Sequence, residues 1–275
     1  MGHRYWLLLV AGIPACNSKV ALRYHPRGSP IHHYVLTMHY GREDAAVLST
    51  GPRHDRVWTI YYTQFERFTD PTGNGSEVGL KVDSAALQSS EDALDLSTMK
   101  GRTITAFFDG RGQLQRTEPA DFPGLTGDMI RRLQAMAAAA APSFPDHPVA
   151  PGAGDAWTMT ARIPVEELES DEGDFPELQV RATLDALRES ANDRVAEVGI
   201  NGQFAPREIR VTTSLGPLPA SSSGTIIGRY SFSLPRGLMI SEEWSGALTV
   251  VTNAPLVGRD TLLSRIVTQT TIRLQ

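Results

Sequence analysis

Cysteine is nearly absent from this sequence, which contains a single one at position 16. A lone cysteine excludes a disulfide within the chain, and it also excludes a metal site built from several thiolates. A chain of 275 residues can bury a sizeable core without such cross-links. Packing and hydrogen bonding therefore have to hold the fold together.

An excess of positive charge is missing as well. The 26 Lys and Arg residues face 31 Asp and Glu residues, which gives a formal net charge of -5. Proteins that bind nucleic acids normally carry a basic stripe that neutralises phosphates, and this sequence has none. Hydrophobic residues make up 41% of the chain, which is ordinary for a globular protein. We therefore expect a folded protein with no nucleic-acid partner.

Long apolar runs are also lacking, and the one apolar run near the start covers only Tyr5–Ile13. A run of this length is too short to cross a ~30 Å hydrocarbon core as a helix. It follows Arg4 and has the length of the apolar region of a secretory signal. We predict that residues 1–15 are a signal peptide; the alternative is a buried apolar strand with an incidental cysteine.

The stretch "IPAC" at residues 13–16 resembles the lipobox of bacterial lipoproteins. In that family a branched apolar residue lies three positions before the cysteine, and a small residue directly precedes it. The resemblance implies that Cys16 is acylated on sulfur and becomes the mature N-terminus, with residues 16–30 as a tether. Several acyl chains on one residue anchor a protein stably. Because Asn17 follows, the resemblance implies an exported protein anchored to the outer membrane, facing the periplasm.

Most of the remaining sequence alternates apolar and polar residues with a period of two, as half-buried strands do. We predict an N-terminal β half over residues 31–145 and a C-terminal β half over residues 146–275, and we expect "GPLPASSSG" at 216–224 to be a flexible connection. Arg111-Gly112 and Arg236-Gly237 lie in similar contexts about 125 residues apart, so an internal duplication stays open. The predicted strand faces are Tyr34–Tyr40, Val57–Phe68, Val78–Val82, Ile104–Phe108, Trp157–Val165, Ile226–Leu234 and Ile266–Leu274.

One segment, residues 124–141, has apolar residues at helical spacing. It predicts an α+β fold that is predominantly antiparallel β, as a curved sheet or incomplete barrel in two possibly related halves with one principal amphipathic helix. The helix packs on the sheet as part of the core or covers a lipid cavity. In the second case the candidate contacts of an apolar ligand are Met129, Leu133, Met136 and Met159.

The order of these features is similar to that of a family of uncharacterised bacterial lipoproteins. A "TITAFFDGRGQL" hairpin, the central helix and the connector "FPDHPVAPGAGDAW" follow the lipobox, and Gly154, Asp155 and Trp157 match the family's G-D-x-W strand entry. The resemblance implies an architecture and no activity. The residues themselves predict turns with positive φ at Gly110, Gly112 and Gly154, and a buried Trp157 at the end of a core.

No set of side chains in the sequence indicates a reaction. His33 and His39 would share a strand face at a separation of ~20 Å, which is too far apart to bind one ion. The acidic stretch at 166–177 lacks EF-hand spacing and leaves only weak calcium binding open. Ser97 and Lys100 form an S-x-x-K pair without the other elements of that enzyme class, and phosphate-binding motifs are missing. We expect no enzyme activity, no cofactor and no metal site.

Two functions remain. The first is a lipid-anchored exported protein with a non-catalytic binding or structural role in the cell envelope. The second is a carrier of lipid or another hydrophobic ligand with a helix-covered apolar cavity. Its partners would be the membrane, through the N-terminal lipid, and an apolar ligand or an envelope protein.

Overall fold

Eleven antiparallel β-strands form one continuous sheet in the part of the chain that the computed structural model describes. That part comprises residues 19–24, 31–46, 49–69, 75–89, 96–118, 143–152, 154–162, 177–190, 192–213, 216–252 and 262–275. The strands are β1 (Ile31–Ala46), β2 (Ser49–Thr69), β3 (Gly75–Ser89), β4 (Thr103–Asp109), β5 (Leu114–Glu118), β6 (Ala156–Arg162), β7 (Glu177–Ser190), β8 (Asp193–Thr213), β9 (Gly216–Ser233), β10 (Leu238–Thr252) and β11 (Leu262–Leu274). A short 3-10 helix, η1 (Ser97–Met99), lies between β3 and β4.

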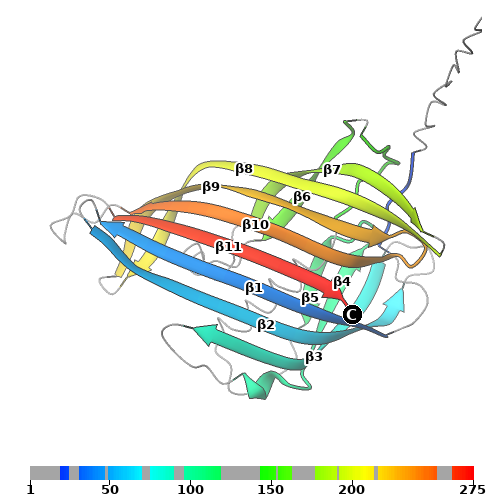
Figure 1. Cartoon of the computed structure of the whole chain (residues 1–275), viewed down its shortest axis with the longest axis horizontal. Helices are drawn as coiled ribbons and strands as arrows, with labels where there is room; N and C mark the ends of the chain where they lie inside the picture. Colours follow the sequence, from blue (N-terminus) through cyan, green and yellow to red (C-terminus); the bar gives the residue numbers. More distant parts are fainter. Residues whose placement is uncertain are drawn as a thin grey trace, which may run out of the picture.

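The strand order across the sheet is β5-β4-β3-β2-β1-β11-β10-β9-β8-β7-β6 (Figure 1). Strands β1–β5 follow one another from the centre to one edge, and β6–β11 follow one another from the other edge to the centre. Only the pairing of β1 with β11 joins strands that are distant in sequence. The two halves of the chain are therefore two halves of a single sheet.

The central pairing of β1 and β11 is long and regular. It runs from Tyr34 opposite Leu274 to Ala46 opposite Leu262. The hydroxyl of Tyr34 also donates a hydrogen bond of 2.8 Å to the backbone oxygen of Met239 on β10, 205 residues away in sequence. These contacts make the centre of the sheet the place where the beginning and the end of the chain meet.

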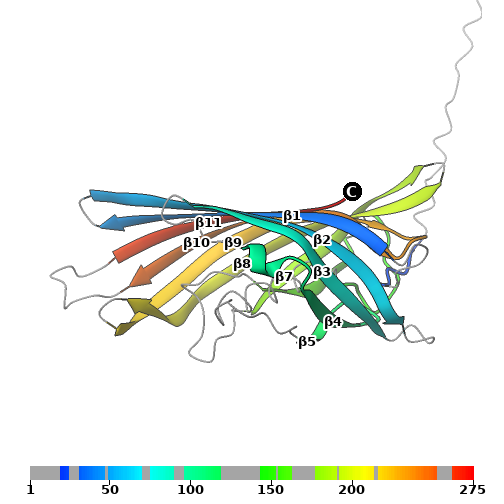
Figure 2. The same cartoon turned by 90° about the horizontal axis from the view of Figure 1, so that it is seen from below.

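The sheet is strongly curved. Strands β3–β5 and strands β7–β9 bend to the same side of β1 and β11, so that the sheet forms a trough (Figure 2). Bulges interrupt the pairing at Glu43/Ala45, Leu184/Ala186 and Met239/Ser241, among other places. Because a β-bulge bends its strand and increases the local twist, these positions contribute to the curvature. We call the concave side the inner face and the convex side the outer face.

Alternate side chains of the strands build the core on the inner face. On β1 the predicted face is confirmed, with Tyr34, Leu36 and Met38 all buried. On β10, Leu248 and Val250 are buried and Thr249 between them is more exposed. Burial of each such side chain contributes roughly 1.5–3 kcal/mol. The period-two pattern thus decides which side of the sheet is apolar.

Two short segments outside the sheet, residues 19–24 and 143–152, pair with each other. The N–H groups of Val20 and Val149 each donate to the other residue's carbonyl, at 2.8 and 3.0 Å. Leu22 and Tyr24 of the first segment are buried in the core. We call these two stretches the closing segments.

The second closing segment connects distant strands. The N–H of Phe144 donates to the carbonyl of Arg111 between β4 and β5, at 2.7 Å, and the N–H of Gly152 donates to the carbonyl of Leu184 on β7, at 3.0 Å. The indole N–H of Trp157 on β6 donates to a carbonyl at the start of this segment, at 2.7 Å. The closing segments therefore bridge the trough at one end of its strands.

A polar network lies at the same end. Ser233 and Arg236 donate hydrogen bonds of 2.6 and 2.8 Å to the two carboxylate oxygens of Asp193. Although partial burial opposes it, hydrogen bonding to Ser233 and Arg236 holds the pKa of Asp193 below its usual range. The network ties the start of β8 to the turn between β9 and β10.

The predicted α+β class is wrong. The described residues are nearly all antiparallel strand and contain no α-helix, while the segment 124–141 lies outside the described residues. The strands are also longer than the sequence pattern suggested: the stretch 216–224, expected to be a flexible connection, belongs to β9. No helix of the described residues has the length and apolar character needed to cross a membrane.

The predicted turn glycines are confirmed at two of three positions. Gly112 and Gly154 have φ values of 76° and 73°, whereas Gly110 does not have a positive φ. The carboxylate of Asp109 accepts hydrogen bonds from the N–H groups of Arg111 and Gln113. In the turn that these hydrogen bonds form, Gly112 rather than Gly110 adopts the left-handed backbone conformation.

Candidate ligand-binding face

An apolar wall lines the inner face along the central strands. Leu248 on β10 lies directly opposite Ile266 on β11, and both are buried. Val250, Ile226 and Trp244 extend the wall to either side and are buried too. The side chains alternate inward because successive residues of a strand point to opposite faces. The result is a long row of buried apolar side chains on three neighbouring strands.

A group of polar side chains interrupts this apolar face. The group comprises the hydroxyl oxygens of Tyr62, Tyr230, Thr268 and Thr270 and the Oε2 atom of Glu242, which are buried and have no hydrogen-bond partner in the structure. We call it the inner polar cluster. A buried polar group without a partner costs ~1–3 kcal/mol, and native proteins contain few of them. Because five such groups lie on one face, we expect another molecule to supply their hydrogen-bond partners.

The register of the sheet places part of the cluster side by side. Tyr230 on β9 lies directly opposite Glu242 on β10, so their Cα atoms are cross-strand neighbours. Thr270 on β11 lies opposite Trp244 and is therefore diagonal to Glu242, within ~8 Å. Three adjacent strands thus present a carboxyl group and two hydroxyl groups on the same face.

Tyr62 reaches the cluster from β2 because it stacks on Tyr34. The two rings lie 5.4 Å apart with an angle of 13° between their planes. The Tyr34 hydroxyl bonds to the backbone oxygen of Met239, three residues before Glu242 on β10. The charge of Glu242 acts on the Tyr62 hydroxyl, so the two side chains lie near each other on the inner face.

Burial determines the ionisation of the cluster. It raises the pKa of Glu242 from the ordinary 4.5 to about 8. Burial, and secondarily the charge of Glu242, raises the pKa of Tyr230. Burial also raises the pKa of Tyr62, with smaller contributions from neighbouring tyrosines and from Glu242. At neutral pH the carboxyl group therefore keeps its proton, and the cluster carries hydroxyl hydrogens and no net charge.

The cluster lies next to the closed end of the trough. The ring of Phe144, in the second closing segment, is fully buried and lies 6.3 Å from Tyr230 and 4.6 Å from Phe232. Since Tyr230 is opposite Glu242, the closing segment borders the cluster directly. From this point the apolar wall runs along the strands, away from the closed end.

The structure places one of the predicted site residues. Met159 lies on β6, is buried, and pairs with Val180 on β7. The lipidation candidate Cys16 and the other predicted apolar contacts, Met129, Leu133 and Met136, lie outside the described residues. The predicted burial of Trp157 is confirmed.

The described histidines do not converge on a common point where a metal could bind. His33 is exposed and lies 3.1 Å from the Thr63 hydroxyl and 4.0 Å from the Asp83 carboxylate. Among the described residues no three His, Cys, Asp or Glu side chains are grouped so that they could hold an ion. Of the acidic stretch 166–177, only Glu177 lies within them, as the first residue of β7.

The S-x-x-K pair lies on the surface. Ser97 and Lys100 are exposed, and the N–H of Lys100 donates to the carbonyl of Ser97 at 3.1 Å. The pair is thus part of the turn at η1. The structure brings neither side chain to the inner face.

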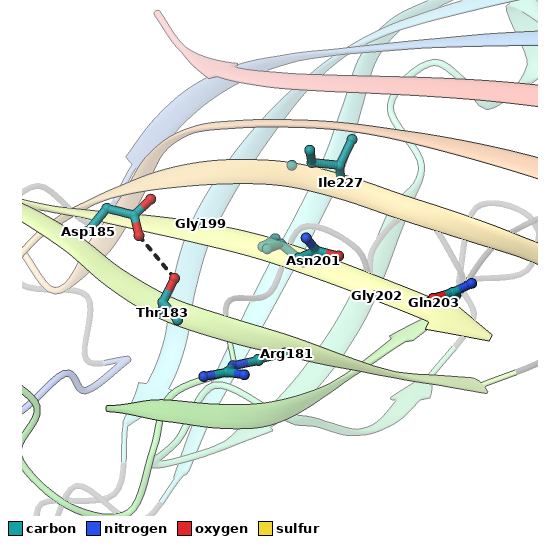
Figure 3. Close-up of a pocket in the computed structure, with 10 residues that line it drawn as sticks. Arg181, Thr183, Asp185, Gly199, Asn201, Gly202, Gln203 and Ile227 are labelled. Atoms are coloured by element: carbon teal, nitrogen blue, oxygen red, sulfur yellow. Dashed lines mark hydrogen bonds between the residues drawn. The ribbon is translucent and has the colours of Figure 1, made fainter. Parts of the chain in front are cut away.

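A polar groove lies on the outer face, where β7, β8 and β9 bend (Figure 3). Its volume is about 610 Å³, and Arg181, Thr183, Asp185 and Asn201 contribute polar groups. Thr183 donates a hydrogen bond of 2.9 Å to Asp185. A Cβ atom at Gly199 would lie 2.6 Å from the Asp185 carboxylate, so the glycine leaves room for that side chain. The groove belongs to the opposite face from the apolar wall.

The sequence contained a signal for the inner polar cluster. Extending the alternation of Leu248, Val250 and Trp244 backwards along β10 places Glu242 on the same face. Thr268 and Thr270 likewise lie in phase with the predicted face of Ile266–Leu274, and both are buried. Polar residues in phase with an apolar strand face are therefore the pattern that would have indicated this site.

Comparison with known proteins shows a likeness that concerns the fold. No family model and no curated protein match the sequence. A solved structure described as "Lipid-protein interactions in lipovitellin" matches with a TM-score of 0.53 and 8% sequence identity. The match covers 92% of this chain and 25% of that chain, so this chain spans about a quarter of the lipovitellin chain.

Proposed function

We propose that this protein binds an apolar ligand, such as a lipid, on the inner face of its sheet. The observation that carries the proposal is the apolar wall of β9, β10 and β11, which begins beside the closed end of the trough. The stretch of β10 from Glu242 to Val250 spans ~26 Å at ~3.3 Å per residue. An acyl chain in one leaflet occupies ~15 Å, half of a ~30 Å hydrocarbon core. The wall is therefore long enough for one acyl chain.

The likeness to lipovitellin supports this proposal. The matched structure is described by its lipid–protein interactions, and a similar fold covers nearly all of this chain. A curved sheet with one apolar face suits such a ligand because contact with apolar atoms favours binding without directional bonds. The proposal adds no catalytic step.

The proposal also includes attachment to a bacterial membrane. The lipobox-like stretch before Cys16 supports export and acylation of that residue, and Asn17 supports sorting to the outer membrane. A cell labelled with radioactive palmitate should incorporate the label into the wild-type chain. Replacement of the residue in the variant Cys16→Ala should abolish the incorporation, and persistent labelling of this variant would contradict the anchor.

Tryptophan fluorescence provides the test of ligand binding. Trp58 and Trp244 lie on the inner face and are buried, so a bound lipid would lie within contact distance of an indole ring. We expect a lipid with bromine atoms in its acyl chain to quench the fluorescence of the full-length protein, because heavy atoms quench only at short range. The same lipid without bromine should leave the fluorescence unchanged.

The double variant Trp58→Phe/Trp244→Phe tests whether the lipid binds beside these two residues. It should lose most of the quenching while the remaining tryptophans still fluoresce. If the wild-type protein shows no quenching at saturating brominated lipid, the inner face does not bind it, and a structural role in the envelope becomes the better explanation.

A further inference from the structure

The inner polar cluster lacks hydrogen-bond partners in a place where they cannot come from bulk water. Glu242 is only 6% exposed, and Thr268 and Thr270 are 1% and 2% exposed. The cluster supplies four hydroxyl groups and one carboxyl group, all of which can donate and accept hydrogen bonds when the carboxyl is protonated. A ligand that complements it must bring several oxygen or nitrogen atoms of its own.

The electrostatics of the site argue against a charged ligand group. Among the described residues, Tyr34, Tyr24 and Glu242 act electrostatically on Tyr62, and Glu242 acts on Tyr230, so no cation is among the groups that influence these two tyrosines. Arg236 acts on Tyr34, but its guanidinium group is already bonded to Asp193 at 2.8 Å. Within the part of the chain that the structure describes, an anionic group would therefore find no cation at the cluster that is not already paired, which is strongly unfavourable in an apolar environment. Protonation of Glu242 at neutral pH likewise removes the natural partner of a cation.

We propose that the inner polar cluster binds the uncharged, oxygen-bearing head group of an amphiphilic lipid, such as the glycerol and ester oxygens of an acylglycerol. This inference rests on the proposed function, because the acyl chain of the same molecule would lie along the apolar wall. The head group lies at the closed end, next to Phe144 and Tyr230. The chain then points along β10 towards Val250.

Lipids that differ only in their head group test this inference. The probes are a monoacylglycerol, a fatty acid and an alkylamine, each with the same dibrominated C18 chain, and the measured quantity is the Kd from tryptophan quenching at pH 6. We expect the monoacylglycerol to bind the full-length protein at least about tenfold more tightly than the other two, the ratio that one satisfied hydrogen bond can provide.

Variants that remove one hydroxyl without changing shape test the assignment of the cluster. Tyr62→Phe and Thr270→Val should each weaken monoacylglycerol binding about tenfold. Tyr61→Phe and Thr271→Val change the neighbouring residues, whose side chains belong to the outer face, and should leave the Kd unchanged. These pairs alter the same residue types on the same two strands, so a general effect of the substitution would appear in both.

The outcomes separate this inference from the proposed function. If none of the three lipids quenches the fluorescence, both fail. If all three bind with the same Kd, or if the cluster and control variants behave alike, an apolar ligand binds but the cluster does not recognise its head group, and buried water satisfies the hydroxyls instead. Tightest binding of the alkylamine would also overturn the inference, because Glu242 would then act as an ionised partner of a cation.

Discussion

Glu242 should make the stability of this protein fall as the pH rises. Its pKa is about 8 in the folded protein and 4.5 for an ordinary glutamate. Between these two values the folded chain keeps a proton that the unfolded chain has lost, so the free energy of unfolding decreases with pH. The stabilisation is complete below pH 4.5 and is lost as the pH rises through the folded-state value.

The magnitude follows from the size of the shift. Each unit of difference in pKa corresponds to ~1.4 kcal/mol, so the window from 4.5 to 8 corresponds to a loss of about 5 kcal/mol. Stabilities of single domains are typically ~5–15 kcal/mol. One carboxyl group would therefore remove a substantial part of the stability of the domain at alkaline pH.

The variant Glu242→Gln isolates this effect, because glutamine has the same shape and does not titrate. The free energy of unfolding is measured in urea at intervals from pH 4 to pH 9. We expect the free energy of unfolding of the variant to rise by about 5 kcal/mol relative to that of the wild type across this range. Most of the gain should occur between pH 5 and pH 8. Other titrating groups cancel because both proteins contain them.

Glu243 provides a matched control on the same strand. It faces the other side of β10, its side chain is 45% exposed, and it pairs with Arg229 at 3.2 Å. The variant Glu243→Gln retains Glu242, so its free energy of unfolding should still fall between pH 5 and pH 8. If the free energy of unfolding of Glu242→Gln falls in the same way, water or another group reaches the Glu242 carboxyl, and the reasoning from its burial is wrong.

Three further substitutions test the packing and the closed end. Gly228→Ala should destabilise the sheet by ~1–3 kcal/mol in urea unfolding, since its Cβ would lie 2.5 Å from the Cβ of Trp244, and an unchanged midpoint would refute this steric argument. Trp157→Phe should lose ~1 kcal/mol with its indole hydrogen bond to the second closing segment, and amide exchange in that segment should accelerate; unaltered exchange would count against its role in closing the trough. Asp193→Asn should be less stable than the wild type above pH 4, and the difference should vanish as the pH falls through the lowered pKa of Asp193; a difference that persists at low pH would assign the loss to something other than the charge that pairs with Arg236.

The inner face of the sheet was largely readable from the sequence. The alternation at Tyr34–Tyr40 and Ile104–Phe108 predicted which side chains are buried. A strand with one solvated face has apolar residues at every second position, because successive side chains point to opposite faces. Strand ends were harder to predict. Ser221, Ser222 and Ser223 have little preference for strands, yet they pair with β10 because long neighbours extend beyond them.

The class of the fold and the inner polar cluster could not be read in the same way. An apolar stripe at helical spacing in residues 124–141 led to an α+β prediction, although a single helical pattern is a small part of the chain and cannot determine how eleven strands connect. The sequence prediction did not include Glu242, because glutamates are mostly exposed and two adjacent ones on a strand point to opposite faces. Only the alternation along β10, continued back from Val250 through Trp244, decides which of the two glutamates points inward.

The pairing of β1 with β11 has a consequence for how the molecule is made. Until the last strand is available, β1 and β10 each present an edge with unpaired N–H and C=O groups, and exposed edges of this kind invite pairing with other chains. Contacts between residues 205 apart in sequence, such as Tyr34 and Met239, also form slowly because a very long loop must close first. The finished protein has its most protected strands in the middle of the sheet, and during synthesis those same strands are the most vulnerable to aggregation.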